Sequence, residues 1–485
     1  MEVGRLAARF REILGDAGVI TDRQQLRTYE CDGLAVYKTT PAIVVLPETA
    51  EQVAGVVRVC ADEGIPYVAR GSGTGLSGGA LPRADGVLVV TSRMRRILEV
   101  DIPNQRAVVE PGVFNLAVTK AAEPDGYYYA PDPSSQQICS IGGNVAENSG
   151  GAHCLKYGFT VNHVLGLEVV TPDGELVQIG GKAADHPGYD LLGAFIGSEG
   201  TLGIATKVTV RLSRAPEEVR TLLAAFDSTD DAGTAVSAII ATGVMPAAIE
   251  MMDALAIEAA EAAVHCNYPE GAGAVLVVEL DGPAVDVAHQ FAAVERHCRD
   301  AGAFEIRIAQ DAEERTLIWK GRKSAFAAVG RISPAYIVQD GVIPRTALPD
   351  VLRSIDRLAR ESGIRVANVF HAGDGNLHPL VLFDDAEQGA EERAEEVSGA
   401  ILDLCIEHGG SITGEHGVGM DKSKFMSRMF TDDDLDTMQM LRCAFDPRGL
   451  CNPGKVFPTP RLCGEAPGVH KGAHPLQEAG LAEMF

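Results

Sequence analysis

The sequence has no cysteine pair with metal-ribbon spacing. Its ten cysteines are scattered along 485 residues, and none forms a Cys-x-x-Cys pair. This excludes the usual zinc-ribbon pattern and the cysteine runs of ferredoxin-type iron–sulfur clusters. We therefore expect mostly reduced, buried cysteines. A protein of this kind that transfers electrons has no cluster of its own to pass them along.

Long apolar runs and excess positive charge are also missing. No segment approaches the roughly 18 apolar residues of a membrane-spanning helix, and the N-terminus lacks a secretory core. The 42 Lys and Arg residues against 67 Asp and Glu residues give a net charge of -25. Such a field repels nucleic acid and anionic membranes. We expect a cytoplasmic protein without a nucleic-acid partner, which meets a membrane only through partner subunits.

The composition, 46% hydrophobic and 22% charged, is that of a globular protein with about two to four domains. Residues 1–37 are predicted to form an amphipathic helix and a polar segment. Residues 38–215 form an α+β unit around glycine-rich loops. Residues 216–430 form a second, ferredoxin-like domain, a sheet with helices on one face. Residues 431–485 form a C-terminal segment.

Periodicity and turn signals locate the individual elements. In the first unit we predict strands at 42–46, 66–69, 87–91, 107–110, 164–171, 176–179 and 204–212, and helices at 48–62 and 113–122. The turn 172–174 indicates a hairpin. In the second domain we predict strands at 272–279, 304–308, 335–342 and 364–370, and helices at 284–301, 348–362 and 383–408, the last ending at Gly409-Gly410.

The strongest local feature is the first loop, residues 70–79, which follows a predicted strand directly. Backbone N–H groups in such a loop can converge on a pyrophosphate, and glycine allows close approach. Residues 73–78 fit G-x-G-x-x-G, but a nicotinamide-type dinucleotide fold needs a helix to follow. Pro82 and Asp85-Gly86 lead into another strand instead, which disfavours that fold. A glycine turn without a ligand stays open as an alternative.

Two more loops of this kind follow, the second loop at 140–151 and the third loop at 197–204. Each is rich in glycine and small polar residues, and each alone is a weak signal. Together they indicate one long ligand that is held at several points.

A different constellation lies in the second domain. Residues 369–379 predict a strand, a turn at Asp374-Gly375-Asn376 and a strand, which would bring His371 and His378 together. Residues 414–419 add Glu415 and His416 on a glycine-flexed loop. Two imidazoles and a carboxylate suit a zinc- or manganese-like ion with open positions for a substrate. Because the spacing alone is not specific, plain structural histidines remain an alternative.

The sequence resembles the vanillyl-alcohol oxidase (PCMH-type) flavoproteins, in particular their D-2-hydroxyacid dehydrogenase branch. The matching segments occur in the same order and are the three glycine-rich loops, the two histidine segments, and residues 41–49, 131–133 and 451–457. The resemblance covers nearly the whole chain. Residues 461–465 are most similar to the FAD-carrying subunits of glycolate oxidases within it. The resemblance implies a PCMH-type FAD-binding domain at 38–215, a cap (substrate) domain with a metal site at 216–430, and a segment at 431–485 that returns to the FAD domain.

The resemblance also implies how FAD is held. The pyrophosphate would lie on residues 71–75. Some relatives carry a covalently linked histidine in the first loop where this chain has Thr74, so we expect non-covalent FAD. The cofactor-binding residues implied are Arg70, Gly71, Ser72, Gly73, Thr74, Gly75, Pro131, Asp132, Ser140, Gly142, Gly143, Asn144, Asn148, Gly150, Gly151, Glu199, Gly200, Gly203, Ile204 and Asn452.

For the chemistry, the resemblance implies that His371, His378 and Glu415 bind the metal and that His416 is the base. Oxidation of a 2-hydroxy acid removes the hydroxyl proton and delivers a hydride from Cα to flavin N5. A metal would lower the hydroxyl pKa, and a neutral histidine can take the proton. Arg322, in a segment similar to one that holds the substrate carboxylate, can grip it bidentately. A helix-surface arginine is the alternative.

The function expected is an FAD-dependent dehydrogenase of a small 2-hydroxy acid, glycolate or D-lactate. Relatives that act on 2-hydroxyglutarate have an extra lysine in the strand before a proline, and residues 337–344 contain none. Alternatives are a flavin oxidase that uses oxygen, a dehydrogenase of D-2-hydroxyglutarate, and an FAD-binding assembly subunit without chemistry. The resemblance implies iron–sulfur and second flavoprotein partners that pass electrons to quinone.

Overall fold

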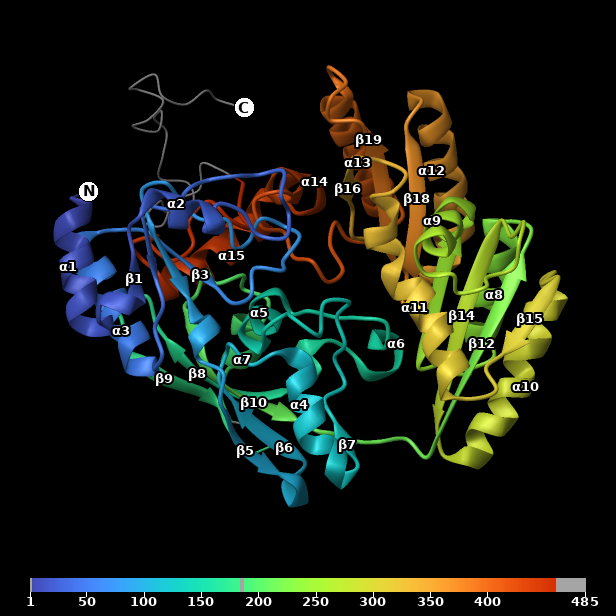
Figure 1. Ribbon diagram of the computed structural model, residues 1–485, viewed down its shortest axis with the longest axis horizontal. Helices are drawn as coiled ribbons and strands as arrows, with labels where there is room; N and C mark the ends of the chain where they lie inside the picture. Colours follow the sequence, from blue (N-terminus) through green and yellow to red (C-terminus); the bar gives the residue numbers. More distant parts are fainter. Residues whose placement is uncertain (1, 184–186, 459–485) are drawn as a thin grey trace.

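The computed structural model describes residues 2–183 and 187–458 of the chain (Figure 1). Residues 461–465, which carried part of the sequence resemblance, lie outside the described residues. The first half of the chain forms two larger sheets and a small two-stranded one, and the second half adds one large sheet beside them (Figure 1). Among the described residues, no helix is both long enough and apolar enough to cross a bilayer.

The first sheet has the order β1-β2-β4-β3. Its strands are β1 (Val19–Ile20), β2 (Ile43–Val45), β4 (Val87–Val90) and β3 (Tyr67–Arg70), and the last three are parallel. Helix α3 (Ala50–Glu63) crosses between β2 and β3, starting at the Thr49 N-cap and ending at left-handed Gly64. Helix α1 (Val3–Leu14) buries Leu6 and Phe10 in the same core, and the short helix α2 (Arg23–Leu26) follows it.

The second sheet is antiparallel, with the order β5-β6-β10-β8-β9. Its strands are β5 (Ile97–Asp101), β6 (Arg106–Val109), β10 (Ile204–Arg211), β8 (Val164–Val170) and β9 (Leu176–Gly180). The predicted hairpin is confirmed, because Val170 pairs with Leu176 across the turn. Helix α4 (Asn115–Ala122) covers this sheet, and a small ribbon pairs β7 (Tyr127–Tyr128) with β11 (Ser213–Arg214).

Three short helices lie among the glycine-rich loops. The second loop, predicted without a helix, contains α5 (Ile141–Glu147), and α6 (Cys154–Tyr157) follows it. Helix α7 (Leu191–Phe195) precedes the third loop. The first loop leads to β4 without a helix, as the sequence indicated when it disfavoured the nicotinamide-type fold.

The second domain, here called the cap, contains an eight-stranded sheet with the order β15-β12-β14-β13-β18-β19-β16, while β17 (Gly341–Val342) pairs with β19. Every pair is antiparallel. The strands are β12 (Glu218–Phe226), β13 (Ala248–Asp253), β14 (Ala274–Gly282), β15 (Glu305–Ile308), β16 (Ala335–Val338), β18 (Arg365–His371) and β19 (Asn376–Phe383). Strands β12 to β15 take the ferredoxin-like βαββαβ arrangement, with one helix inserted between β13 and β14.

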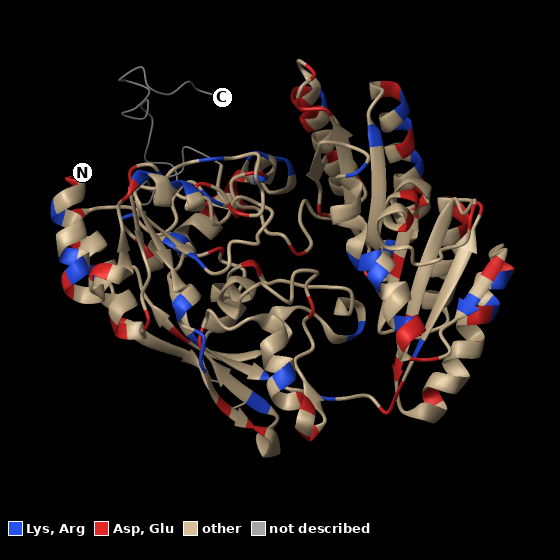
Figure 2. Ribbon diagram, viewed as in Figure 1, with Lys and Arg blue, Asp and Glu red and all other residues tan. Residues whose placement is uncertain are grey.

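Helices cover both faces of the cap sheet, so the prediction of helices on one face only is wrong. Helices α8 (Thr229–Ala241), α10 (Ala284–Asp300), α12 (Leu348–Ser362) and α13 (Ala390–Glu407) pack on one face. Helices α9 (Ala254–Val264) and α11 (Ala312–Val329) pack on the other. The reason lies in strands such as β12, where Leu222 and Leu223 point to opposite faces and both are apolar. Both signs of charge are mixed along the outer helices (Figure 2).

Two predicted boundaries also change. The predicted strand at 335–342 is interrupted at Gln339 and Asp340, which separate β16 from β17. The helix predicted from 383 begins at Ala390, because residues 384–389 form turns instead.

After α13 the chain runs back to the first sheet through α14 (Met426–Met429) and α15 (Asp432–Phe445). The backbone N–H of Tyr67 donates to the Leu450 carbonyl at 2.9 Å, and that of Asn452 donates to the Tyr67 carbonyl at 2.8 Å. Segments from both ends of the chain therefore build the edge of the sheet beside the first loop.

Candidate functional site

One cavity is lined by all three glycine-rich loops and by the loop that carries Glu415 and His416. The residues of the predicted cofactor set that line it are Arg70, Gly71, Ser72, Gly73, Thr74, Gly75, Ser140, Gly142, Gly143, Asn144, Glu199, Gly200, Gly203 and Ile204. The cavity wall also includes Thr91, Ser135, Glu147 and Ser198, which the sequence did not single out. Segments far apart in sequence thus meet around one cavity.

The first and second loops touch at Gly71 and Ser140. The N–H of Ser72 donates to Ser140 Oγ at 3.2 Å. A Cβ at Gly71 would lie only 2.0 Å from the same oxygen, so a larger side chain fits there only if the Ser140 side chain or the second loop moves. Glycine at this position lets the two loops approach each other closely.

Asn452 is buried and ties two of the loops together from behind. Its Nδ2 donates to the Gly79 carbonyl at 2.9 Å and to the Glu199 carbonyl at 2.6 Å. Glu199 in turn accepts the N–H groups of Val418 and Gly419, both at 2.6 Å. These bonds join the first loop, the third loop and the segment that follows His416.

Six residues of the predicted cofactor set do not line the cavity: Asn452, described above, and Pro131, Asp132, Asn148, Gly150 and Gly151. Asp132 instead accepts a hydrogen bond from His153, with 2.9 Å between Oδ2 and Nδ1. Asn148 closes α5 in a left-handed conformation and accepts the Val161 N–H.

The remaining three support their neighbours. The Pro131 carbonyl accepts from the side chain of Asn115. Gly151 passes close behind Asp132, and a Cβ at Gly150 would lie 2.8 Å from Glu415 Oε2. Gly150 therefore leaves room for the carboxylate that faces the histidines.

The two histidines of the β18–β19 hairpin lie next to each other, as the turn signal indicated. His371 pairs with Asn376 and Val369 with His378, so the two imidazoles are diagonal neighbours on one face, with ring centres 4.9 Å apart. Glu415 Oε1 lies 3.2 Å from Nε2 of each. The nitrogen and oxygen donors of the three side chains all lie within 4.8 Å of one another.

We call His371, His378 and Glu415 the trio. In each of its two histidines, Nδ1 lies next to a polar group that orients the ring. His371 Nδ1 lies 2.8 and 3.0 Å from the two oxygens of Glu250, a fully buried residue of β13. His378 Nδ1 lies 3.4 Å from the Gln339 carbonyl. With Nδ1 occupied in this way, both Nε2 atoms face Glu415, as in histidines that bind a metal.

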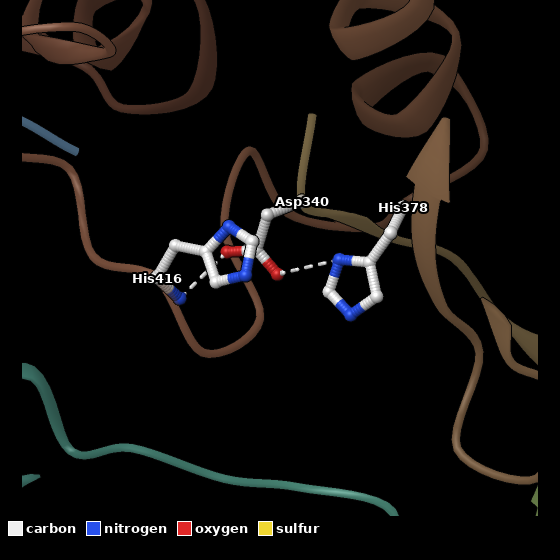
Figure 3. Close-up of side chains that lie close together, drawn as sticks. All are labelled: Asp340, His378 and His416. Atoms are coloured by element: carbon white, nitrogen blue, oxygen red, sulfur yellow. Dashed lines mark hydrogen bonds and ion pairs between the residues drawn. The ribbon is translucent and has the colours of Figure 1, made fainter. Parts of the chain in front are cut away.

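His416 stacks on His378 at 4.9 Å between ring centres, and Asp340 lies between the two residues (Figure 3). Asp340 accepts the His416 backbone N–H at 2.8 Å and lies 3.8 Å from His378 Nδ1. It also accepts from Thr413 Oγ1, from the backbone of Gly414 and Glu415, and from Lys422 Nζ. One buried carboxylate therefore shapes the loop that carries Glu415 and His416.

Burial and neighbouring charges set the protonation of these groups. Burial lowers the pKa of His416 to about 4, so its imidazole is neutral. Burial alone would raise the pKa of Glu415, but His371 and His378 hold it well below its usual range. Burial would also raise the pKa of Asp340, but its charged neighbours, the ammonium of Lys422 among them, lower it instead.

Arg322, from α11, is buried rather than on the helix surface, with 3% of its side chain exposed. Its Nη2 lies 2.6 Å from Glu250 Oε2, so Glu250 links Arg322 to His371. Arg322 Nε is buried without a hydrogen-bond partner among the described residues. Arg322 therefore lies near the histidines, with the Glu250 side chain between it and His371.

Two residues that orient the site, Glu250 and Asp340, were not predicted from the sequence. Glu250 lies between apolar residues inside Ala248–Asp253, and Asp340 follows the apolar strand Ala335–Val338. An unpaired charge rarely occupies such a position, and this was the available signal.

The chain is similar to known families and proteins along its length. A model of an FAD binding domain matches residues 41–180, and one of the C-terminal domain of FAD linked oxidases matches residues 215–456. The chain is 53% identical over 470 residues to the glycolate oxidase subunit GlcD of Escherichia coli (strain K12), an alignment that covers 96% of this chain and 94% of that one. It is 31% identical to the D-lactate dehydrogenase of Anaerostipes hadrus, over 92% and 96% of the two chains.

Two solved structures share the fold. p-Cresol methylhydroxylase superposes with a TM-score of 0.79 at 18% identity, covering 93% of this chain and 96% of the other. The 4-ethylphenol oxidase of Gulosibacter chungangensis gives 0.78 at 19% identity, over 94% and 97%. The expected PCMH-type fold is confirmed.

Proposed function

The chain belongs to the family of FAD-linked oxidoreductases that contains the GlcD subunits and D-lactate dehydrogenases, and from this premise we propose that it oxidises a small 2-hydroxy acid, glycolate or D-lactate, to the 2-oxo acid. One observation carries the proposal. Glu415 and His416 line the same cavity as the three glycine-rich loops, so a site for a metal and a base opens directly onto a site for FAD.

The residues of the cavity fit FAD. At Gly71, Ser72 and Ser140 the first and second loops bring glycine backbone and small polar side chains to the cavity wall, which are the groups that bind a pyrophosphate. Ser198 Oγ is a buried polar atom of the wall without a partner among the described residues. Bound FAD would accept the hydride from the substrate Cα. We expect FAD to be non-covalent, with Thr74 in the wall where some relatives link it.

The trio of His371, His378 and Glu415 fits a divalent ion, zinc or manganese. Two imidazoles and one carboxylate converge, and outer partners hold the imidazoles in the orientation that a metal ligand needs. A bound ion would lower the pKa of the substrate hydroxyl and fix its direction. Arg322 does not line the cavity, but its Nε has no hydrogen-bond partner among the described residues, and it stays our candidate for the substrate carboxylate.

His416 is the proposed base. Its imidazole is neutral at physiological pH because burial lowers its pKa, and it faces the cavity beside Glu415. Asp340 holds its backbone in place, so the ring is presented to the cavity by a rigid loop. A neutral imidazole at that point takes the hydroxyl proton while the hydride leaves Cα.

The names of the GlcD relatives as subunits support assembly with other chains. We propose that this chain acts in the cytoplasm and passes its electrons to iron–sulfur and second flavoprotein subunits, with quinone as the final acceptor. Full turnover with quinone by this chain alone would contradict that assignment.

The test of the substrate is anaerobic. The purified, FAD-saturated protein is mixed in turn with glycolate, D-lactate, L-lactate and D-2-hydroxyglutarate, and the flavin absorbance is followed. We expect rapid bleaching with glycolate or D-lactate. In His416→Gln the rate should fall by a factor of about 10² to 10⁴ with FAD content unchanged. Bleaching by none of the four acids would contradict the substrate assignment.

A further inference from the structure

Glu147 is an acidic residue of the cavity that the proposed chemistry does not use. It is the last residue of α5, and its side chain lines the cavity between the first loop and His416. Its Oε2 is completely buried without a hydrogen-bond partner among the described residues. A carboxyl group in this position needs a partner, because an unpaired buried polar group is costly.

Glycines from two separate loops make room for this carboxyl group. A Cβ at Gly79 would lie 2.7 Å from Glu147 Oε1, and a Cβ at Gly417 would lie 2.1 Å from Oε2. Gly417 also has φ +85°, a left-handed conformation that favours glycine. The carboxyl group is therefore built into the wall, next to the residue that follows His416.

The charges that face Glu147 favour its neutral form. Burial raises the pKa of Glu147 well above its usual range, and the carboxylates of Glu199 and Asp32 raise it further. Two lysines oppose this shift, but each is bound elsewhere. Lys422 Nζ contacts Asp340 at 3.3 Å, and Lys455 Nζ donates to the Leu81 carbonyl at 2.9 Å.

We propose that Glu147 is a cofactor-binding residue that, as a neutral carboxylic acid, donates its O–H to an electronegative atom of the flavin and so favours reduced over oxidised FAD. Glu147 lies beside Gly417, the residue after His416, and His416 faces the same cavity. Because His416 is the proposed base, we assign Glu147 to the flavin end of the FAD site. Reduction adds electron density to the flavin acceptor atoms, so a donor to them binds more strongly after reduction. The inference rests on FAD binding and not on the identity of the substrate.

The test compares Glu147→Gln and Glu147→Leu in the FAD-loaded protein. The midpoint potential is measured by chemical reduction without substrate. The leucine side chain removes the donor, so the ratio of affinities for reduced and oxidised FAD should fall about tenfold, which is about 30 mV for a two-electron couple. The glutamine side chain keeps an N–H donor without charge, so the ratio should stay within about twofold of wild type.

Infrared spectroscopy supplies a second readout. The reduced-minus-oxidised difference spectrum of wild type should contain the C=O stretch of a protonated carboxylic acid, and Glu147→Gln should lose it. Glu110→Gln is the matched control, because Glu110 is buried in the same domain but bound to Arg96 outside the cavity. It should change neither the potential nor the band.

Three results would overturn the proposal. A clear rise of the potential in Glu147→Gln would mean that the wild-type group is a charged carboxylate. An unchanged potential in Glu147→Leu would mean that it does not bind the flavin. A wild-type spectrum without the acid band would mean that it is not protonated. If Glu147→Leu does not retain FAD, the midpoint potential of Glu147→Gln and the infrared spectrum still test the proposal. Because no substrate is used, a wrong substrate assignment would not affect these results.

Discussion

Glu250 offers a test of how the histidine cluster is held together. It never touches the cavity, yet it contacts His371 at 2.8 and 3.0 Å and Arg322 at 2.6 Å, and it is 1% exposed. In Glu250→Gln the amide keeps the size of the side chain but loses its charge. His371 then loses the acceptor pair that fixes its ring and tautomer, and Arg322 loses its buried counter-charge.

The expected magnitude follows from these contacts. Loss of the outer partner of a metal-ligating histidine lowers metal affinity by about 10- to 100-fold, or about 1.4 to 2.8 kcal/mol. The unpaired guanidinium lowers the free energy of unfolding by roughly 3 to 5 kcal/mol, since both partners are almost fully buried. Affinity for Mn²⁺ and Zn²⁺ is measured by calorimetry on FAD-saturated protein, and unfolding by denaturant titration.

Glu279→Gln is the matched control. Glu279 lies in the neighbouring strand, is equally buried, and accepts from Arg315 and Trp319 without touching the trio. It should be destabilised as well but should bind the metal like wild type. Equal metal affinity in the two variants would refute the claim that Glu250 positions His371.

Three further predictions follow from individual contacts. Gly71→Ala should abolish FAD retention while the apoprotein still folds, because its Cβ would lie 2.0 Å from Ser140 Oγ; flavin absorbance after gel filtration measures this, and normal FAD content would contradict it. Arg322→Lys should lower kcat/KM for the 2-hydroxy acid at least tenfold at unchanged FAD content, because a point charge replaces a bidentate fork; an unchanged kcat/KM would remove Arg322 from the substrate site. Burial would lower the pKa of His153, but the carboxylates of Asp132 and Glu279 raise it from 6.5 to about 10. The charge of His153 therefore stabilises the folded state fully below pH 6.5, and this contribution is lost as the pH rises through about 10. His153→Gln should therefore melt below wild type at neutral pH and converge with it above pH 10; a difference that persists there would contradict this reasoning.

Much of the fold was predictable where the local pattern differs from its surroundings. The β8–β9 hairpin follows from its turn residues, and the neighbouring histidines follow from the β18–β19 turn, because a short turn fixes the register of both strands. The faces of the cap sheet were not predictable in this way. Strands such as β12 are apolar on both sides, so the alternation that would show which face carries helices is lost.

The residues of the candidate site also differ in how far the sequence predicted them. The glycine-rich loops and the four histidine and glutamate residues carry their signal in short motifs. Glu250 and Asp340 carry none, because their partners lie far away in sequence: Glu250 is 121 residues from His371, and Asp340 is 76 residues from His416. Only the topology of the eight-stranded sheet, with β13 beside β18, brings the first of these pairs together.

In the proposed mechanism, the oxidation of a 2-hydroxy acid requires a metal that is held by His371, His378 and Glu415. The most direct measurement is anaerobic flavin bleaching by glycolate or D-lactate before chelation, after chelation, and after Mn²⁺ or Zn²⁺ is returned. We predict that chelation stops bleaching with FAD still bound, that the ion restores it, and that His378→Ala cannot be restored. Bleaching at the original rate in the chelated, metal-free protein would contradict the claim.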